Sequence, residues 1–330
     1  MRFILQNIIL LVQFLSIIAQ CICPSINKKV NPSDICINSS YSQEWWYFLH
    51  NVLDDTSPIV SIENTWIREG LYCNMTSLYL YQESILWKNG TFSHNFKYIK
   101  KNDHQKSYIW EIDNRYLYYF KKNSKYNINI LSKSANISME GYGYPQGKLK
   151  NGFVRTGKNI CDTSYTLSFL NLDTLINNFK AVSYGEHVYT TQKKGSSPYI
   201  GWNCHYSHNL YPKLNFKAYF LCQSKFADKS KQDPYQRALI LLDDNSTSWT
   251  NNFIVTQLQN WTNKKTNITY PISWKINLIK NSSHYLIANN PEQEIVSINN
   301  FNFWDGSAML FDGEIGFIGL GFNEILKTTK

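Results

Sequence analysis

The sequence predicts an all-β protein built from two tandem antiparallel β-barrel domains. Apolar and polar residues alternate along many short segments, which is the period of a half-buried strand, while helical periodicity is hard to find. Stretches rich in Asn, Lys and Ser separate these segments and are typical of turns. Many short strands at regular spacing indicate sandwiches or barrels, and closed barrels would remove unpaired sheet edges.

The clearest hairpin pattern lies between residues 108 and 130. Residues 108–112, 116–120 and 126–130 each alternate, and residues 121–125 read Lys-Lys-Asn-Ser-Lys, which indicates a turn. Tyr, Trp, Phe and Ile dominate these segments and suit a pleated, half-buried surface. Further strands are expected at residues 59–66, 77–87, 163–170, 217–222, 238–242, 253–258, 272–279 and 308–311.

Two stretches interrupt the strands. Residues 141–147 are Gly-rich, and residues 227–234 form a polar segment that ends in Asp-Pro. We therefore expect an N-terminal β-domain at residues 22–225 and a C-terminal β-domain at residues 226–330.

Residues 1–21 have the features of a secretory signal peptide. Arg2 precedes an apolar run that reaches Ile18, and small residues follow it. The run is shorter than the roughly 20 apolar residues of a spanning helix and has polar breaks. We expect cleavage, no integral membrane segment afterwards, and a secreted or secretory-lumen protein.

The cysteines fit the same compartment. The chain has seven, and cleavage after Cys21 leaves an even number, as expected where disulfides form. The pairing cannot be read from the sequence, although Cys23 and Cys36 would close a short loop.

The chain carries many Asn-x-Ser/Thr sequons, each of which must lie on the surface if it is used. The chain is rich in Asn throughout, so some sequons arise by chance, and we expect N-glycans at only some of them. The sequons begin at Asn38, Asn74, Asn89, Asn136, Asn245, Asn260, Asn267 and Asn281.

The net charge of +9 does not indicate a nucleic-acid partner. The lysines are scattered, mostly beside Asn and Ser in expected turns, and form no basic stripe. A solvated surface is the better interpretation.

Five motifs occur in a characteristic order. Glu44-Trp45-Trp46-Tyr47 comes first, and Tyr-Pro-x-x-Trp at 270–274, Glu-Gln-Glu at 292–294, Phe-Trp-Asp-Gly-Ser at 303–307 and a Gly-rich aromatic segment at 316–322 follow. This order resembles the hydroxyneurosporene synthase (AttH-like) family of lipocalin-like proteins, across nearly all of the mature chain. The resemblance implies two calycin-type barrels and a cavity at or between them for a long apolar, polyene-like or polyketide-like ligand.

Two motifs depart from the family pattern. Members often carry D-H-E-W and then G-W-D-W, where this chain reads Glu186-His187-Val188-Tyr189 and later Gly-Trp-Asn203-Cys. A carotenoid hydratase protonates a carbon–carbon double bond, which requires a positioned acid. An amide cannot supply that proton, so the residues at 188 and 203 speak against hydratase chemistry specifically.

Four residues are candidate acid–base groups: Glu44, Glu186, His187 and Asp305. Glu44 precedes three aromatic residues in an expected strand, and its alternative role is to pair with a cation such as Arg68 and fix the register. Glu186 and His187 are adjacent, so they face opposite sides of a strand. His187 has the more suitable pKa for proton transfer near neutrality, but a hydrogen-bonded structural role is equally compatible.

The candidate ligand-binding residues are mostly aromatic, and ordinary barrel core is the alternative interpretation. Because Trp45 and Trp46 are adjacent, only one can point inward. The candidates are Trp45, Trp46, Tyr47, Trp202, Asn203, His205 and Trp304.

No metal or cofactor is expected. His205 and His208 would point to opposite faces of a strand, and Cys204 is better suited to a disulfide. The sequence has no G-x-S-x-G nucleophile elbow, and its Gly-rich segment at 316–321 lies in an expected closing strand and not in a nucleotide loop.

Three functions remain compatible with these residues. The first is a cofactor-free isomerase, cyclase or hydratase acting on a hydrophobic small molecule. The second is a non-catalytic carrier of such a molecule. The third is an extracellular adhesion or glycan-binding module, which would present exposed tryptophans.

Overall fold

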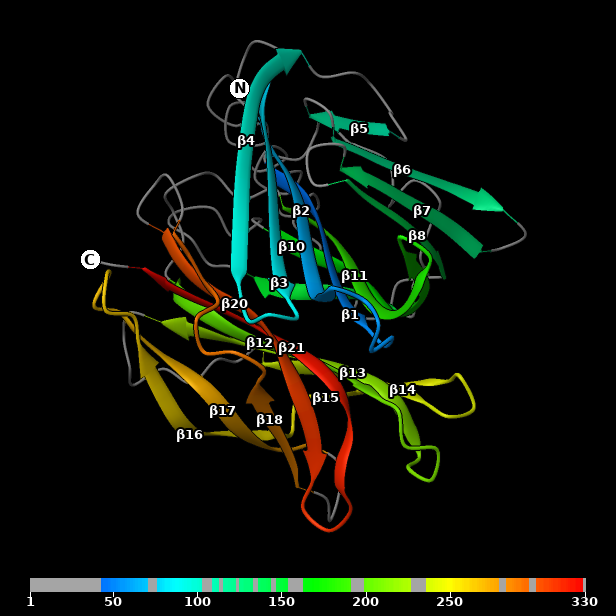
Figure 1. Ribbon diagram of the computed structural model, residues 1–330, viewed down its shortest axis with the longest axis vertical. Helices are drawn as coiled ribbons and strands as arrows, with labels where there is room; N and C mark the ends of the chain where they lie inside the picture. Colours follow the sequence, from blue (N-terminus) through cyan, green and yellow to red (C-terminus); the bar gives the residue numbers. More distant parts are fainter. Residues whose placement is uncertain are drawn as a thin grey trace, which may run out of the picture.

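The computed structural model describes residues 43–70, 76–102, 109–112, 115–122, 125–132, 136–143, 147–153, 163–190, 199–226, 236–278, 283–296 and 301–328. Every regular element in these residues is a β-strand, and all strand pairs are antiparallel. The described residues contain no helix that is long and apolar enough to span a bilayer. The strands form two curled sheets, one above the other in Figure 1.

The N-terminal sheet has the hydrogen-bonded order β4-β3-β2-β1-β11-β10-β8-β7-β6-β5, and β9 also pairs with β10. The predicted strands and the hairpin at residues 108–130 are confirmed here, since Lys122 of β6 faces Lys125 of β7. The strands are β1 (Gln43–Val52), β2 (Ile59–Gly70), β3 (Thr76–Trp87), β4 (Phe92–Asn102), β5 (Ile109–Ile112), β6 (Arg115–Lys122), β7 (Lys125–Ser132), β8 (Ile137–Gly143), β9 (Gly147–Phe153), β10 (Thr163–Ile176) and β11 (Phe179–Thr190).

The C-terminal sheet has the order β15-β14-β13-β12-β21-β20-β18-β17-β16, and β19 also pairs with β20. Its strands are β12 (Tyr199–Asn209), β13 (Phe216–Phe226), β14 (Arg237–Leu242), β15 (Thr247–Thr250), β16 (Ile254–Thr262), β17 (Thr269–Asn277), β18 (His284–Ala288), β19 (Glu294–Val296), β20 (Phe301–Asp312) and β21 (Gly316–Thr328).

The two sheets repeat one topology. In each, the first strand of the half pairs with the last, as β1 with β11 and β12 with β21, and the earlier strands follow on one side and the later ones on the other. The expected tandem lipocalin-like architecture is confirmed as two half-barrels. Closure is not seen, because among the described strands β4 does not pair with β5, nor β15 with β16.

The chain changes sheet between Thr190 and Tyr199, earlier than the expected division after residue 225. Strands β12 and β13 therefore belong to the C-terminal sheet. The polar stretch at 227–234 falls between β13 and β14, which are paired strands of that sheet. A polar stretch indicates a connection between strands, but its composition does not distinguish a connection within one sheet from a linker between two domains.

Within the described residues, three apolar clusters hold the fold together. One fills the N-terminal half-barrel and a second fills the C-terminal one. A third lies between the sheets and contains Tyr47 and Leu49 from one, and Tyr206 and Phe322 from the other. Strand β1 alternates accordingly, with Trp46 in the half-barrel interior and Tyr47 between the sheets. Both faces of the central strands are buried, which explains their mixed sequence pattern.

Cys204 and Cys222 form a disulfide between directly opposed residues of β12 and β13, with Cα atoms 4.1 Å apart. The predicted use of Cys204 in a disulfide is confirmed. The remaining cysteines, including Cys23 and Cys36, lie outside the described residues, as does the expected signal peptide.

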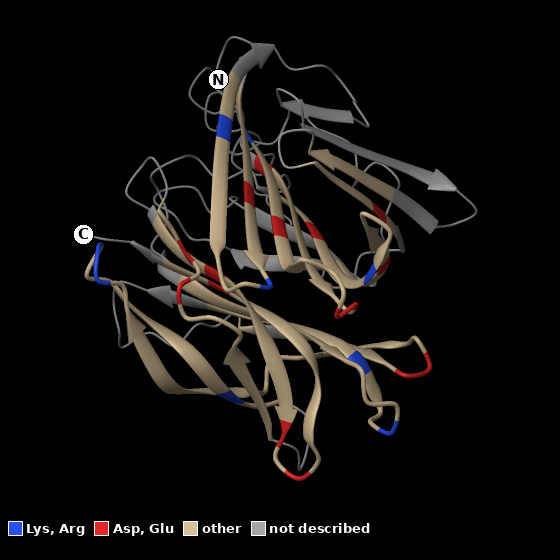
Figure 2. Cartoon of the chain, in the orientation of Figure 1, with Lys and Arg blue, Asp and Glu red and all other residues tan. Residues whose placement is uncertain are grey.

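The described sequons are accessible at the surface. The sequon asparagines within the described residues are Asn89, Asn136, Asn245, Asn260 and Asn267, and all are exposed. Figure 2 shows Lys and Arg well separated from one another, whereas several acidic bands lie within strands of both sheets.

Candidate active site between the two sheets

The fold distributes the predicted site residues over three places. Glu44, Trp46 and His187 lie in the N-terminal half-barrel, and Asn203, His205 and Trp304 lie in the C-terminal one. The others face the space between the sheets, and they are Trp45, Tyr47, Glu186, Trp202 and Asp305.

A charged network fills the N-terminal half-barrel. His187 Nε2 donates to Glu44 Oε1 at 2.7 Å, and Arg68 Nε lies 3.7 Å from Glu44 Oε2. The Trp46 ring stacks on the His187 ring, with centroids 4.4 Å apart. Arg68 stands directly opposite Glu44 on β2, so the pairing that the sequence suggested for Glu44 is present.

A second polar network lies in the same interior and was not foreseen from the sequence. Tyr81 donates its hydroxyl proton to Glu83 Oε2 at 2.5 Å, and Asn64 Nδ2 donates to the Tyr81 oxygen at 2.9 Å. Ser132 adds a long contact of 3.4 Å to the same carboxylate. These side chains and the Glu44 network are all buried, so the interior is a hydrogen-bonded polar core that solvent does not reach.

A cluster of four carboxyl groups lies between the sheets. Glu63 and Glu186 come from the N-terminal sheet, and Asp305 and Glu324 come from the C-terminal sheet. All four act on one phenol: burial raises the pKa of Tyr47 well above its usual value, and the four negative charges raise it further. The groups therefore surround Tyr47, whose hydroxyl has no hydrogen-bond partner within the described residues.

Three carboxyl groups of this cluster have pKa values above their ordinary range. Burial raises the pKa of Glu63 to about 7, although hydrogen bonds from Thr65 and Gln82 to its carboxylate act in the opposite direction and lower the pKa. Burial and then the charges of Glu63 and Glu324 hold the pKa of Asp305 well above its ordinary range. For Glu324 the pKa rises to about 8, through burial first and the charge of Glu186 second.

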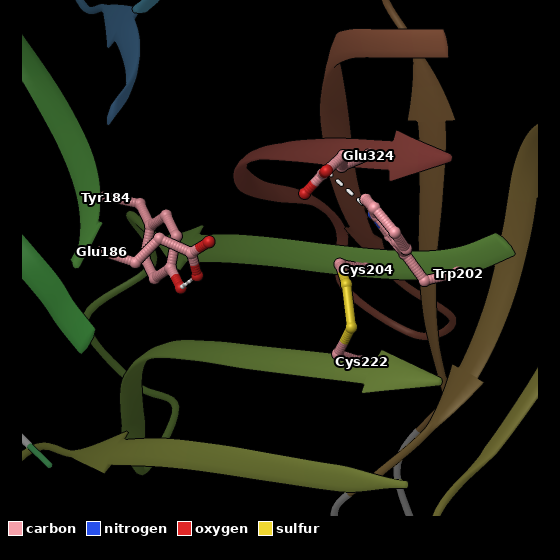
Figure 3. The surroundings of a disulfide bond; sticks show 6 residues. All are labelled: Tyr184, Glu186, Trp202, Cys204, Cys222 and Glu324. Carbon is pink, nitrogen blue, oxygen red and sulfur yellow. Dashed lines mark hydrogen bonds between the residues drawn. A yellow bond between two sulfur atoms is a disulfide. The ribbon is translucent and has the colours of Figure 1, made fainter. Parts of the chain in front are cut away.

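Glu186 and Glu324 form the pair most suited to proton transfer. Tyr184 donates its hydroxyl proton to Glu186 Oε2 at 2.6 Å, and Trp202 Nε1 donates to Glu324 Oε1 at 2.8 Å. Figure 3 shows both pairs beside the disulfide. Glu324 is the member of the cluster that keeps partial exposure. The charge of Glu186 adds to the effect of burial on the pKa of Glu324, so Glu324 retains its proton near neutrality.

Aromatic side chains flank this pair. Trp45, Trp202 and Trp249 are partly buried against the apolar cluster between the sheets. Tyr184 stacks on Phe220 across the sheets, with centroids 5.2 Å apart. The surroundings are therefore apolar and π-rich around a small set of acids, which is the usual make-up of a small-molecule site.

The C-terminal interior holds the remaining predicted residues. His205 Nδ1 donates to Asn323 Oδ1 at 2.5 Å, and the His205 ring meets the edge of Trp274. His208, on the opposite face of β12, contacts the hydroxyl of Tyr206 at 3.4 Å, as the alternation predicted. No group of three or more His, Cys, Asp or Glu residues in the described part of the chain has a geometry that could hold a metal ion.

The two departures from the family pattern lie in different places. Val188 lies two residues from Glu186 on the same face of β11. The glutamate that the family pattern has at this position would therefore belong to the carboxyl cluster, and this chain lacks it. Asn203 faces the C-terminal interior, one strand away from Ile325 of that core. The presence of Asn in place of Asp at position 203 therefore does not change the cluster of acids between the sheets.

No protein-family profile and no curated protein matches the sequence. Among solved structures, an AttH-like protein from Nitrosomonas europaea is similar with a TM-score of 0.72 and 14% identity, over 93% of this chain and 99% of that one. This chain has the AttH-like fold.

Two other structures share the AttH-like fold with this chain. Kievitone hydratase from Nectria haematococca has a TM-score of 0.57 and 12% identity, over 93% of this chain and 98% of that one. CghA, in complex with Sch210972, has a TM-score of 0.51 and 9% identity, over 93% and 96%. The resemblance that the five motifs suggested is confirmed in the fold, across nearly the whole length.

Proposed function

We propose that this protein is a cofactor-free acid–base enzyme that binds a hydrophobic small molecule between its two sheets and hydrates, isomerises or cyclises it. The observation that carries the proposal is the Glu186–Glu324 pair. It joins one acid from each sheet, in apolar surroundings, with a partly exposed carboxyl group that remains protonated at neutral pH.

The chemistry follows from these groups. The Glu324 carboxyl donates its proton to one carbon of a double bond, and the other carbon becomes cationic. The ionised Glu186 and the π-faces of Trp202 and Trp45 stabilise that cation. Water then adds and loses a proton to the Glu324 carboxylate, which gives hydration. Alternatively, the cation loses a different proton to Glu186, which gives isomerisation, or a second double bond of the substrate attacks the cationic carbon before that proton is lost, which gives ring closure. In both of these cases the proton returns from Glu186 to the Glu324 carboxylate before the next cycle.

The charge of the cluster disfavours an anionic substrate, and the aromatic surroundings favour an apolar one. The charges that act on Tyr47, Asp305 and Glu324 are all carboxylates, so an anionic ligand would be repelled. The name of kievitone hydratase agrees with this reaction class, by analogy of fold alone.

We also propose that the protein passes through the secretory pathway and carries N-glycans at some of its sequons. The apolar start of the chain, the Cys204–Cys222 disulfide and the exposure of every described sequon asparagine support this.

A carrier is the second candidate, and Val188 favours it because this residue removes an acid from the cluster. The adhesion alternative has less support, since no tryptophan whose side-chain burial the structure describes is exposed.

Turnover in heavy water separates enzyme from carrier. The purified protein is incubated with lipophilic extract from its own source in D2O, and mass spectrometry follows deuterium incorporation and the gain of one water. The wild type and Glu314→Gln, which changes an exposed turn residue, should turn over alike. Glu324→Gln should lose on the order of a hundredfold or more in rate while retaining the ligand in native mass spectra.

Equal turnover by Glu324→Gln would refute the assigned acid. Ligand retention without turnover by the wild type would leave the carrier as the function.

A further inference from the structure

Within the described residues, the hydrogen-bonded order of each sheet ends in two strands, β4 and β5 in the N-terminal sheet and β15 and β16 in the C-terminal one. The short side strands β9 and β19 also pair on one side only. An edge strand presents unpaired backbone N–H and C=O groups, which can pair with a second chain. Proteins counter this with charges, proline, bulges or very short edge strands.

Three of these edges have such protection. The sequence of strand β4 contains three lysines, Lys97, Lys100 and Lys101. Strands β5 and β15 are four residues long each.

Strand β16 is different. It spans nine residues, Ile254–Thr262, with the sequence IVTQLQNWT, which contains neither a charged residue nor proline. Ile254 is 61% exposed and Leu258 is 49% exposed. Its described pairing with β17 shifts register on both sides of Gln259, so this irregularity is confined to one point and residues 254–257 pair in regular register. A long, uncharged strand with exposed apolar side chains is a site of edge-to-edge association.

The same strand carries a sequon. Asn260-Trp261-Thr262 lies near its end, next to the register shift, and the Asn260 side chain is exposed. A second sequon begins at Asn267, exposed and in a left-handed conformation (φ 57°) in the turn between β16 and β17. An N-glycan is bulky and strongly hydrated, so one attached here would occupy the space that a pairing strand needs.

We propose that Asn260 is an N-glycosylation site whose glycan protects the β16 edge from pairing with a second copy of the chain. The inference rests on the proposed passage through the secretory pathway. It adds that glycosylation at this position has a structural role that the other described sequons do not share.

The test has two parts. Peptide mapping of protein purified from its source, after enzymatic deglycosylation in heavy-oxygen water, measures occupancy at each sequon. Light scattering then compares secreted recombinant wild type with Asn260→Gln. The matched control is Ser138→Ala, which removes the Asn136 sequon at the β7–β8 turn while keeping Asn136 in its left-handed conformation.

We expect Asn260 to be occupied, the wild type and Ser138→Ala to be monomeric, and Asn260→Gln to form dimers or larger species. Adding Leu258→Lys to Asn260→Gln should restore the monomer, because a lysine blocks edge pairing without a glycan. This rescue separates edge protection from misfolding.

Two results would overturn the proposal: an unmodified Asn260, or a monomeric Asn260→Gln at the same concentration. If the other sequons are occupied, the failure is specific to this edge, whereas unmodified asparagines throughout would also refute the secretory route.

Discussion

Glu63→Gln should stabilise the protein in alkaline solution and leave it almost unchanged in acid. Glu63 is 1% exposed, and burial raises its pKa from 4.5 to about 7. This corresponds to about 3 kcal/mol of preference for the protonated carboxyl in the folded protein. Because the folded-state pKa is the higher one, this stabilisation is complete below about pH 4.5 and is lost as the pH rises through about 7.

The glutamine variant has no proton to lose, and its carbonyl still accepts from Thr65 and Gln82. At about pH 8 its midpoint of thermal unfolding should therefore exceed that of the wild type by roughly 6–12 °C, and at about pH 5 the two should nearly coincide. Thermal unfolding followed by circular dichroism across this range measures the difference. Glu314→Gln, at an exposed turn, is the control. A midpoint difference for Glu63→Gln that does not depend on pH would refute the reasoning.

Three further predictions concern stability, each measured by urea unfolding. Arg68→Met should cost about 3–5 kcal/mol because it leaves the Glu44 charge buried without that cation, and adding Glu44→Gln should recover part of the loss; a fully additive double variant would contradict the pairing. Replacing Cys204 and Cys222 together by alanine should cost about 3 kcal/mol, from the entropy of a loop with a sequence separation of 18, and an unchanged midpoint would be inconsistent with the disulfide. Gly185→Ala should cost about 1–3 kcal/mol, since its Cβ would lie 2.9 Å from a phenylalanine ring, whereas a neutral result would show that the site relaxes.

Strand alternation predicted which neighbours separate but not where each one goes. It placed Glu186 and His187 on opposite faces, and likewise Trp45 and Trp46, as the structure has them. Both faces of β1 and β11 are buried, one inside a half-barrel and the other against the second sheet. A sequence in which both faces are buried contains no signal for which face meets the other sheet.

The most consequential residues were missed for a related reason. Glu63 lies in an expected strand and Glu324 lies two residues beyond the expected closing segment at 316–322. Only the packing of one sheet on the other brings the two acids together. A carboxyl group within an apolar strand, as in Phe322-Asn323-Glu324-Ile325-Leu326, was the available signal. Each such acid, taken alone, reads as a surface residue of an antiparallel sheet, because the depth of its burial is a tertiary property.

The central claim is that an apolar substrate meets the Glu186–Glu324 pair between the two sheets. The most direct measurement is a crystal structure of the deglycosylated protein purified from its own source with its co-purified ligand. The ligand should lie between the sheets, against Trp202 and within reach of the Glu324 carboxyl. A ligand inside either half-barrel, beside His187 or beside His205, would contradict the claim.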